Sequence, residues 1–231
     1  MRFEELDWQQ TAMGELTLRR RLEPSVGREV FEVKLGEEYL MSSLFTAAEE
    51  ELATLGLAAT VSTNLDVLVG GLGLGYTAVA ALRDPRVRAL TVIDALPAVI
   101  DWHERGLLPV SAELTGDQRT NLVHDDFFAV MRQEHVGGAQ RYDVILLDVD
   151  HSPRHSLNPS HADLYTVPGL QALKSHLKVD GAFALWSDDP PDNEFMSKLS
   201  AVFAEAIAHV VEFANPVAGG TSSNTVYVAR G

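Results

Sequence analysis

The chain has 231 residues, of which 46% are hydrophobic and 22% are charged. These values fit a folded protein with one large domain, or a core with a small appendage, and they exclude a disordered or fibrous chain. The formal net charge of −15 repels nucleic acid phosphates and anionic lipid, so we expect a neutral or cationic small molecule as the partner and no nucleic acid. The chain has no cysteine, which excludes disulfides, thiolate nucleophiles and zinc–thiolate sites.

The sequence begins with MRFEELDWQQ, which is polar and acidic. This segment lacks the apolar region of a secretory signal, and no stretch of the chain approaches the roughly 18 apolar residues that a membrane span needs. We therefore expect a cytoplasmic protein that binds no membrane.

Residues 14–41 alternate apolar and polar side chains between glycine-containing breaks, which predicts half-exposed strands joined by turns. Residues 43–57 then carry apolar side chains at helical spacing, and this predicted helix ends near Gly56. We therefore expect residues 1–55 to form a small N-terminal β-strand unit with a connecting helix, and residues 56–231 to form a larger domain.

The larger domain alternates short apolar runs with amphipathic segments. The predicted strands are residues 65–70, 88–94, 120–124, 142–148, 181–187, 209–215 and 224–229. The predicted helices are residues 76–84, 96–106, 127–135, 166–177 and 192–208. This alternation is typical of a mostly parallel α/β sheet with helices on both faces. The last connection is short and rich in glycine, so we expect a hairpin and an antiparallel last strand.

The first strand of this domain runs into a glycine-rich turn, GGLGLGY, which contains Gly71, Gly73 and Gly75. Glycine lets the backbone approach a ligand closely and leaves amide groups free for it. The third glycine falls one residue too early for the dinucleotide fingerprint G-x-G-x-x-G. The pattern instead resembles motif I of the class I AdoMet-dependent transferases, although a tight turn without a ligand is the alternative.

Acidic residues follow the next two strands. Asp94 ends the second strand, where an open sheet places a carboxylate beside the ribose hydroxyls of a nucleoside; its alternative role is to cap the helix that follows. Asp126 follows the third strand, at the position where this fold family places an acid against the adenine amino group, and Phe127 can flank the ring. Asp125 competes with Asp126, and either residue could cap the next helix.

The fourth strand is closed by Asp148, Asp150 and His151. Ligands of open α/β sheets bind outside the carboxyl ends of the strands, so we expect these side chains to face the same crevice as the glycine turn. A carboxylate there can orient a nucleophile or take its proton, whereas the alternative role is loop capping. The histidines nearby do not have the spacing of a metal site, and we expect no metal.

In order and spacing, VLVGGLGLG, TVID, LVHDDFF, YDVILLDVDHSP and residues 163–185 resemble the spermidine synthase family, over about Leu65 to Ser187. The residue two places before the first motif glycine is Val69, as in polyamine synthases, whereas ordinary methyltransferases usually have an acid there. The resemblance implies a Rossmann-like class I AdoMet-dependent methyltransferase fold with a small N-terminal β unit, an AdoMet-type nucleoside as donor, and often a dimer.

The chain departs from the family pattern at several positions. Leu74 stands where the family's Gly-Gly-Gly-Asp-Gly loop has an acid that helps to hold the aminopropyl donor. His151 stands at the last position of the Asp-Ser-Ser-Asp motif, whose second acid acts on the attacking amine. A family glutamine and a Tyr-His pair are also missing from residues 37–53. These changes remove charge partners and a base for a polyamine substrate.

We therefore predict a transferase that moves a methyl group from S-adenosylmethionine to a small acceptor. The alternatives are an aminopropyltransferase that uses decarboxylated S-adenosylmethionine with an atypical cationic amine, and a non-catalytic nucleoside-binding module. In this assignment the three motif glycines contact the methionine portion, and Asp148 serves the acceptor together with Asp150 or His151. A histidine with a pKa near neutrality can remove a proton. We expect a homodimer, as the resemblance implies.

Overall fold

The computed structural model describes residues 3–11, 13–133 and 140–231. The strands are β1 (Phe3–Thr11), β2 (Gly14–Glu23), β3 (Arg28–Leu35), β4 (Glu38–Ser42), β5 (Leu65–Gly70), β6 (Val87–Asp94), β7 (Thr120–His124), β8 (Tyr142–Leu147), β9 (Leu177–Ser187), β10 (Glu205–Ala214) and β11 (Thr221–Arg230). The helices are α1 (Ala47–Ala58), α2 (Tyr76–Leu82), α3 (Pro97–Glu104), α4 (Ser111–Gly116), α5 (Phe127–Arg132), α6 (Val167–Ser175) and α7 (Asn193–Val202), with a short 3₁₀ turn at Pro159–His161. No helix within these ranges is long and apolar enough to cross a membrane.

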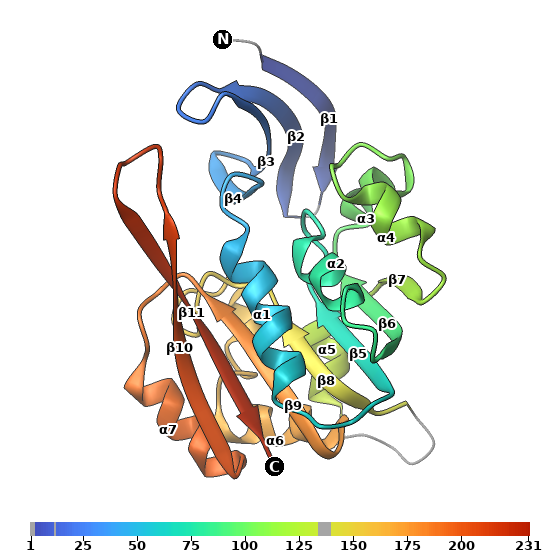
Figure 1. Cartoon of the computed structure of the whole chain (residues 1–231), viewed down its shortest axis with the longest axis vertical. Coiled ribbons are helices and arrows are strands. Elements are labelled where there is room, and N and C mark those ends of the chain that lie inside the picture. The colour runs from blue at the N-terminus through green and yellow to red at the C-terminus, as the bar shows by residue number, and fades with distance from the viewer. Residues whose placement is uncertain (1–2, 12, 134–139) are drawn as a thin grey trace.

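The larger sheet has the strand order β10-β11-β9-β8-β5-β6-β7. Strands β5 to β9 are parallel, and β11 pairs antiparallel with both β9 and β10. The predicted fold class, a mostly parallel seven-stranded sheet with an antiparallel strand from a final hairpin, is confirmed. Helices α1 and α2 cover one face of this sheet, and α5 and α6 lie on the other (Figure 1).

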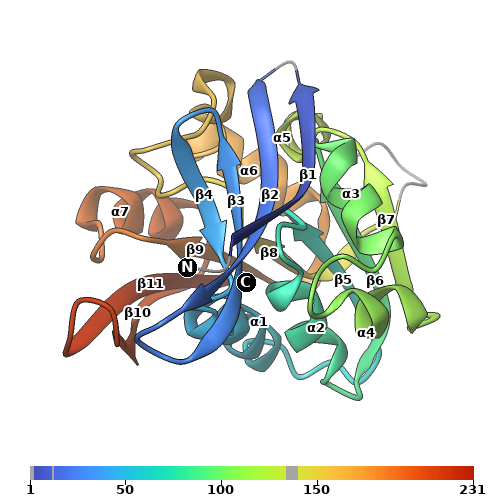
Figure 2. The ribbon, with the colours of Figure 1, turned by 90° about the horizontal axis from the view of Figure 1, so that it is seen from above.

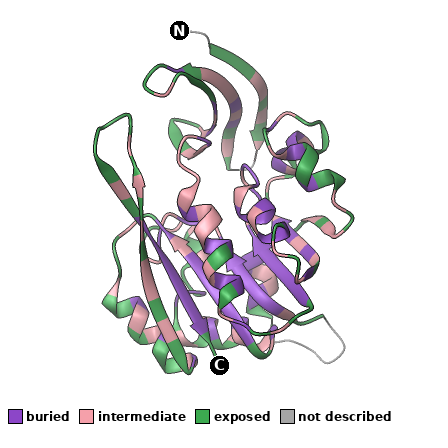
Figure 3. Ribbon diagram, in the orientation of Figure 1, coloured by how far each residue is buried: buried purple, intermediate pink, exposed green. Residues whose placement is uncertain are grey.

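Alternate side chains of the central strands pack into two separate hydrophobic cores, one on each face of the sheet. Val67 and Val69 pack in one core with α1 and α2, whereas Leu68 packs in the other with α5 and α6. The central strands are therefore buried along their length (Figure 3), as expected for parallel strands that are covered on both faces. This rigid core fixes the ends of β5, β6 and β8, from which the site is built.

The smaller sheet is antiparallel, with the order β1-β2-β3-β4. It lies over the end of the larger sheet at which the glycine turn follows β5 (Figures 1 and 2). Trp102 of α3 helps to anchor it, because its Nε1 donates a hydrogen bond of 2.6 Å to Asp7 on β1. Leu16 and Leu18 of β2 are buried in the same core as α1.

Three details differ from the sequence prediction. The helix predicted over residues 192–208 ends at Val202, and Glu205 already pairs with Arg230 in the terminal hairpin. The alanine-rich sequence of residues 201–208 favours a helix, but the pairing of β10 with β11 overrides this propensity. Strand β1 and helix α4 were not predicted, since β1 is largely exposed and α4 has only 6 residues. Residues 134 and 135, the end of the helix predicted over 127–135, lie outside the described residues.

Candidate active site

Two adjoining cavities lie where the small sheet meets the end of the large one. The smaller, of about 220 Å³, is bounded by the segments that follow β5, β6, β7 and β8. The larger, of about 600 Å³, lies between β4, α1, the glycine turn and the β10–β11 hairpin. Both cavities share the following residues: Leu40, Met41, Gly73, Asp148, Val149 and His151. The shared residues mark a junction at which two bound molecules could meet.

The glycine turn has the left-handed backbone that only glycine adopts easily. Gly71, Gly73 and Gly75 have φ angles of 93°, 49° and 91°. A Cβ atom on Gly71 would also overlap the carbonyl oxygen of Asp148, so the backbones after β5 and β8 approach too closely for any side chain. Gly71 and Gly73 line the smaller cavity, and Gly73 and Gly75 line the larger one.

Asp94 holds the glycine turn from the side of β6. One carboxylate oxygen, Oδ2, accepts hydrogen bonds from the amides of Leu72 (2.9 Å) and Gly73 (3.5 Å), and Oδ1 accepts one from Leu96 (2.8 Å). Burial raises the pKa of the Asp94 carboxyl, against the opposing effect of these amides. Asp94 lines the smaller cavity, where its predicted contact with a ribose stays a prediction.

Asp126 and Phe127 form another wall of the smaller cavity. Asp126 is the N-cap of α5 and accepts a hydrogen bond of 3.1 Å from the amide of Ala129 through Oδ1. The competing residue, Asp125, does not line either cavity. Phe127 is buried, and a Cβ atom on Gly70 would lie only 2.5 Å from its ring, so this ring packs directly against the end of β5.

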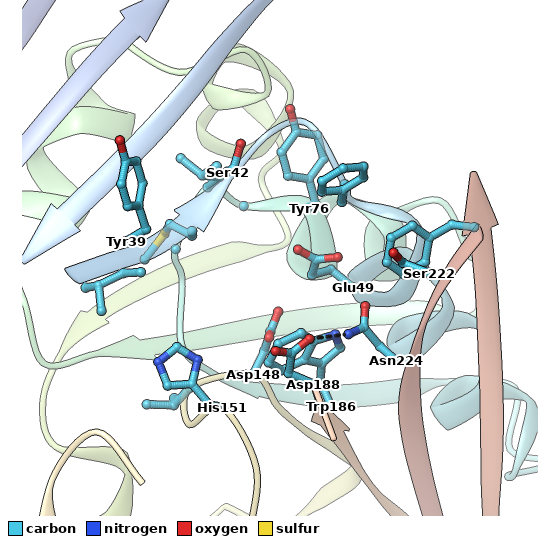
Figure 4. A pocket seen from close by; sticks show the side chains of 18 of the residues that line it. Tyr39, Ser42, Glu49, Tyr76, Asp148, His151, Trp186, Asp188, Ser222 and Asn224 are labelled. Carbon is cyan, nitrogen blue, oxygen red and sulfur yellow. Dashed lines mark hydrogen bonds between the residues drawn. The ribbon is translucent and has the colours of Figure 1, made fainter. Parts of the chain in front are cut away.

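Asp148 faces the junction of the two cavities, and Glu49 of α1 faces the larger cavity beside it (Figure 4). Thr77 donates a hydrogen bond of 2.6 Å to Oδ2 of Asp148. Burial raises the pKa of Asp148 to about 6, and burial together with the Asp148 charge raises the pKa of Glu49 to about 8. Within the described part of the chain, neither carboxyl has an ion pair with lysine or arginine, so the pair would favour a bound cation.

His151 also lines both cavities. Its Nε2 lies 3.3 Å from Oε1 of Glu38, so the imidazole reaches toward strand β4 of the small sheet. A proton-transfer role for His151 stays a prediction. The geometry does place it at the junction, as the strand-end argument predicted.

Asp150 lies elsewhere, contrary to our expectation that it serves the acceptor. It is buried and lines neither cavity. Its carboxylate accepts hydrogen bonds from the amide of Leu157 (2.7 Å), from His161 Nδ1 (2.8 Å) and from the Tyr165 hydroxyl (2.6 Å). Asp150 therefore ties down the loop after β8, and the His161 ring that it holds stacks on Phe128 in the wall of the smaller cavity.

The far wall of the larger cavity is aromatic and largely uncharged. The rings of Phe45 and Phe213 are in contact, with centroids 5.5 Å apart, and Trp186, labelled in Figure 4, lines the same cavity. One acid occurs here: Asp188, whose Oδ1 accepts a hydrogen bond of 2.7 Å from Asn224. Among the residues that the structure describes, no group of three or more histidine and acidic side chains is arranged to hold a metal ion.

Sequence reasoning missed Glu49. It lies in the run Glu49–Glu50–Glu51 of an amphipathic helix, and no local signal separates it from its two neighbours. Only the packing of α1 against the large sheet turns Glu49, rather than Glu51, into the larger cavity.

Comparison with known proteins places this site in a family. Residues 46–218 match the sequence model of the spermine/spermidine synthase domain, a span that includes the glycine turn and Asp148. The chain belongs to this family. The resemblance seen in the sequence is thereby confirmed.

Two curated relatives are both named polyamine aminopropyltransferase. The protein from Oceanobacillus iheyensis is 29% identical over 159 residues, which are 66% of this chain and 30% of that protein. The protein from Sulfolobus acidocaldarius is 30% identical over 125 residues, which are 54% of this chain and 39% of that protein. The chain thus matches well under half the length of either relative. Our preference for methyl transfer finds no support here, and the aminopropyltransferase alternative fits better.

Solved structures agree with the predicted fold. Spermidine synthase from Thermotoga maritima superposes with a TM-score of 0.74 and 18% identity, covering 98% of this chain and 72% of that one. A spermidine synthase in complex with the transition state analogue AdoDATO gives a TM-score of 0.76 and 18% identity, covering 98% and 73%. At such identity the likeness concerns the fold, and it confirms the Rossmann-like class I AdoMet-dependent architecture with a small N-terminal β sheet.

Proposed function

We propose that the protein transfers the aminopropyl group of decarboxylated S-adenosylmethionine to an amine. The observation that carries this proposal is the carboxyl pair of Glu49 and Asp148, which has no basic partner among the described residues: Asp148 lies where the two cavities meet, and Glu49 lines the larger cavity. A site that concentrates negative charge at this point favours a cationic acceptor. The family and the names of both relatives support the same reaction.

The two cavities divide the substrates between them in this proposal. The nucleoside of the donor occupies the smaller cavity, with its ribose near Asp94 and its adenine between Asp126 and Phe127. The aminopropyl chain passes Gly73, which lines both cavities, and the acceptor amine occupies the larger one. This arrangement holds the amine in line with the carbon that it attacks, which is the main contribution that a protein makes to such a displacement.

The proposed transfer is a substitution at carbon. The amine nitrogen forms a bond to the aminopropyl carbon next to sulfur, the carbon–sulfur bond breaks, and its electron pair neutralises the sulfonium. Methylthioadenosine leaves as a neutral product. The acceptor reaches the site as an ammonium ion and must lose a proton first, and Asp148 is placed to take that proton because its raised pKa makes it a stronger base than an ordinary carboxylate. His151 is the second candidate.

The acceptor is an amine that differs from the standard polyamines. His151 occupies the position of the acid that acts on the attacking amine in the family pattern, so a usual charge partner of the acceptor is missing. The loss of this acid changes how an ammonium group of a polyamine would be held. This argument supports an atypical amine without naming it.

Calorimetric titration with decarboxylated and intact S-adenosylmethionine, followed by an assay of methylthioadenosine release with a panel of amines, tests the proposal. We expect tighter binding of the decarboxylated donor and amine-dependent release. Asp148→Asn should abolish release, whereas Asp180→Asn, an exposed acid that lines neither cavity, should not. Donor binding without turnover of any amine would instead favour the non-catalytic alternative, and tighter binding of intact S-adenosylmethionine would contradict the proposed donor.

A further inference from the structure

His103 lies behind the glycine turn, outside both cavities. The residue belongs to α3 and is fully buried. Its Nε2 lies 3.0 Å from the carbonyl oxygen of Gly73, and its Nδ1 lies 3.4 Å from the Ser111 hydroxyl. A carbonyl oxygen only accepts hydrogen bonds, so Nε2 must carry a hydrogen. Burial lowers the pKa of His103, which favours the neutral ring and leaves Nδ1 to accept from Ser111.

The turn is thus held from two sides. Asp94 accepts from the amides of Leu72 and Gly73, and His103 donates to the Gly73 carbonyl. Both peptide groups around Gly73 are therefore fixed in direction. Glycine changes its backbone angles at little energetic cost, so Gly73 needs these hydrogen bonds to keep one conformation. Its conformation affects both cavities, because Gly73 lines both. A carbonyl that His103 did not hold could rotate toward the space that the donor needs.

The imidazole also packs tightly against the next glycine of the turn. A Cβ atom on Gly75 would lie 2.7 Å from Cε1 of His103 and 2.9 Å from Val110. The ring and the turn therefore fit as one unit. The neighbouring residue, Trp102, binds Asp7 of the small sheet, so α3 stays anchored independently of His103.

We infer that His103 is a positioning residue for the donor: it keeps the Gly73 carbonyl pointed at α3 and so maintains the shape of the turn that binds the aminopropyl chain. The identity of the donor rests on the proposed function, but the hydrogen bond and its effect on the turn do not.

The test compares His103→Leu, which removes the N–H group, with His103→Gln, whose amide N–H has a similar reach. We expect His103→Leu to weaken binding of decarboxylated S-adenosylmethionine by about fivefold to tenfold, the worth of one hydrogen bond, and His103→Gln to restore most of it. Methylthioadenosine lacks the aminopropyl chain, so its affinity should change less. Leu114→Ala, a buried substitution on α4, serves as the control for a general loss of stability.

A second readout needs no donor. Hydrogen exchange in the ligand-free protein should be faster at residues 72–75 in His103→Leu than in the wild type, and near normal in His103→Gln. The inference is overturned if exchange at these residues is unchanged, or if Leu114→Ala accelerates it equally. If the wild type binds no AdoMet-type nucleoside, the proposed function fails, while the exchange experiment still decides the role of His103.

Discussion

The Thr77 hydroxyl donates a hydrogen bond of 2.6 Å to Oδ2 of Asp148, which ties the start of α2 to the end of β8. Thr77 directly follows the first residue of α2, so this contact joins the end of the glycine turn to the carboxylate at the junction of the two cavities. The other oxygen of Asp148, Oδ1, has no hydrogen bond to a described residue.

Thr77→Val should weaken catalysis without disturbing the core, because valine keeps the shape of threonine. Removal of the hydrogen bond raises the pKa of Asp148 further, since this bond stabilises the ionised form. The acid limb of the kcat/KM profile should therefore move to higher pH, with a loss of about tenfold near neutrality. Thr115→Val, an exposed change on α4, should leave the profile unchanged; a shift in both variants would contradict the assignment.

Glu49→Gln should simplify the pH dependence of acceptor binding. The carboxyl pair titrates in two steps, with pKa values of about 6 for Asp148 and about 8 for Glu49, so its charge becomes more negative as the pH rises through 8. KM for a cationic amine should fall across that range in the wild type and stay level in Glu49→Gln. Glu51→Gln, on the same helix but outside the larger cavity, should behave as the wild type.

The same pair should make the protein less stable at alkaline pH. The folded-state pKa of Glu49 lies above its ordinary value of 4.5, so the folded protein binds the proton more tightly than the unfolded chain does. The stability that this proton provides is complete below pH 4.5 and is lost as the pH rises to about 8. The free energy of unfolding should be measured for both proteins at pH 6 and pH 9. Between these pH values, Glu49→Gln should become more stable relative to the wild type by on the order of 2–4 kcal/mol. A constant difference would argue against a buried, uncompensated carboxyl.

Gly71→Ala should damage both stability and donor binding. The substitution adds strain at a φ of 93° and drives a methyl group into the Asp148 carbonyl, so we expect a loss of about 3 kcal/mol or more. Gly27→Ala separates the backbone strain from the steric overlap, because Gly27 also has a positive φ but nothing lies within 4 Å of its added methyl group. That control should cost only about 1 kcal/mol in chemical denaturation.

Asp150→Asn should lower stability more than it changes chemistry. Asp150 accepts three hydrogen bonds in a buried position, and an amide cannot accept all three through one oxygen. We expect a loss of about 2–3 kcal/mol, since a buried group is left unsatisfied. The pH dependence of kcat should be unchanged. A shifted pH profile would instead indicate that Asp150 acts at the acceptor site.

Local patterns in the sequence determined the parallel sheet and the positions of its functional ends. Period-two and continuous apolar runs set β5 and β7 at the predicted bounds, and the glycine spacing predicted the turn after β5 that lines both cavities. Ligands bind at the carboxyl ends of parallel strands, and this rule predicted that Asp94, Asp126 and Asp148 lie at one edge of the sheet. All three line the smaller cavity. These features follow from backbone geometry, which each segment encodes within itself.

Only the tertiary structure decided which polar side chains face the cavities. Asp148 and Asp150 are two residues apart in one loop, yet the first faces the junction and the second is buried among Leu157, His161 and Tyr165. Glu49 reaches the site from α1, far away in the chain, by the way that helix packs on the sheet. Side-chain direction in a loop and contact between distant elements depend on packing, and a one-dimensional pattern of hydrophobicity does not carry that information.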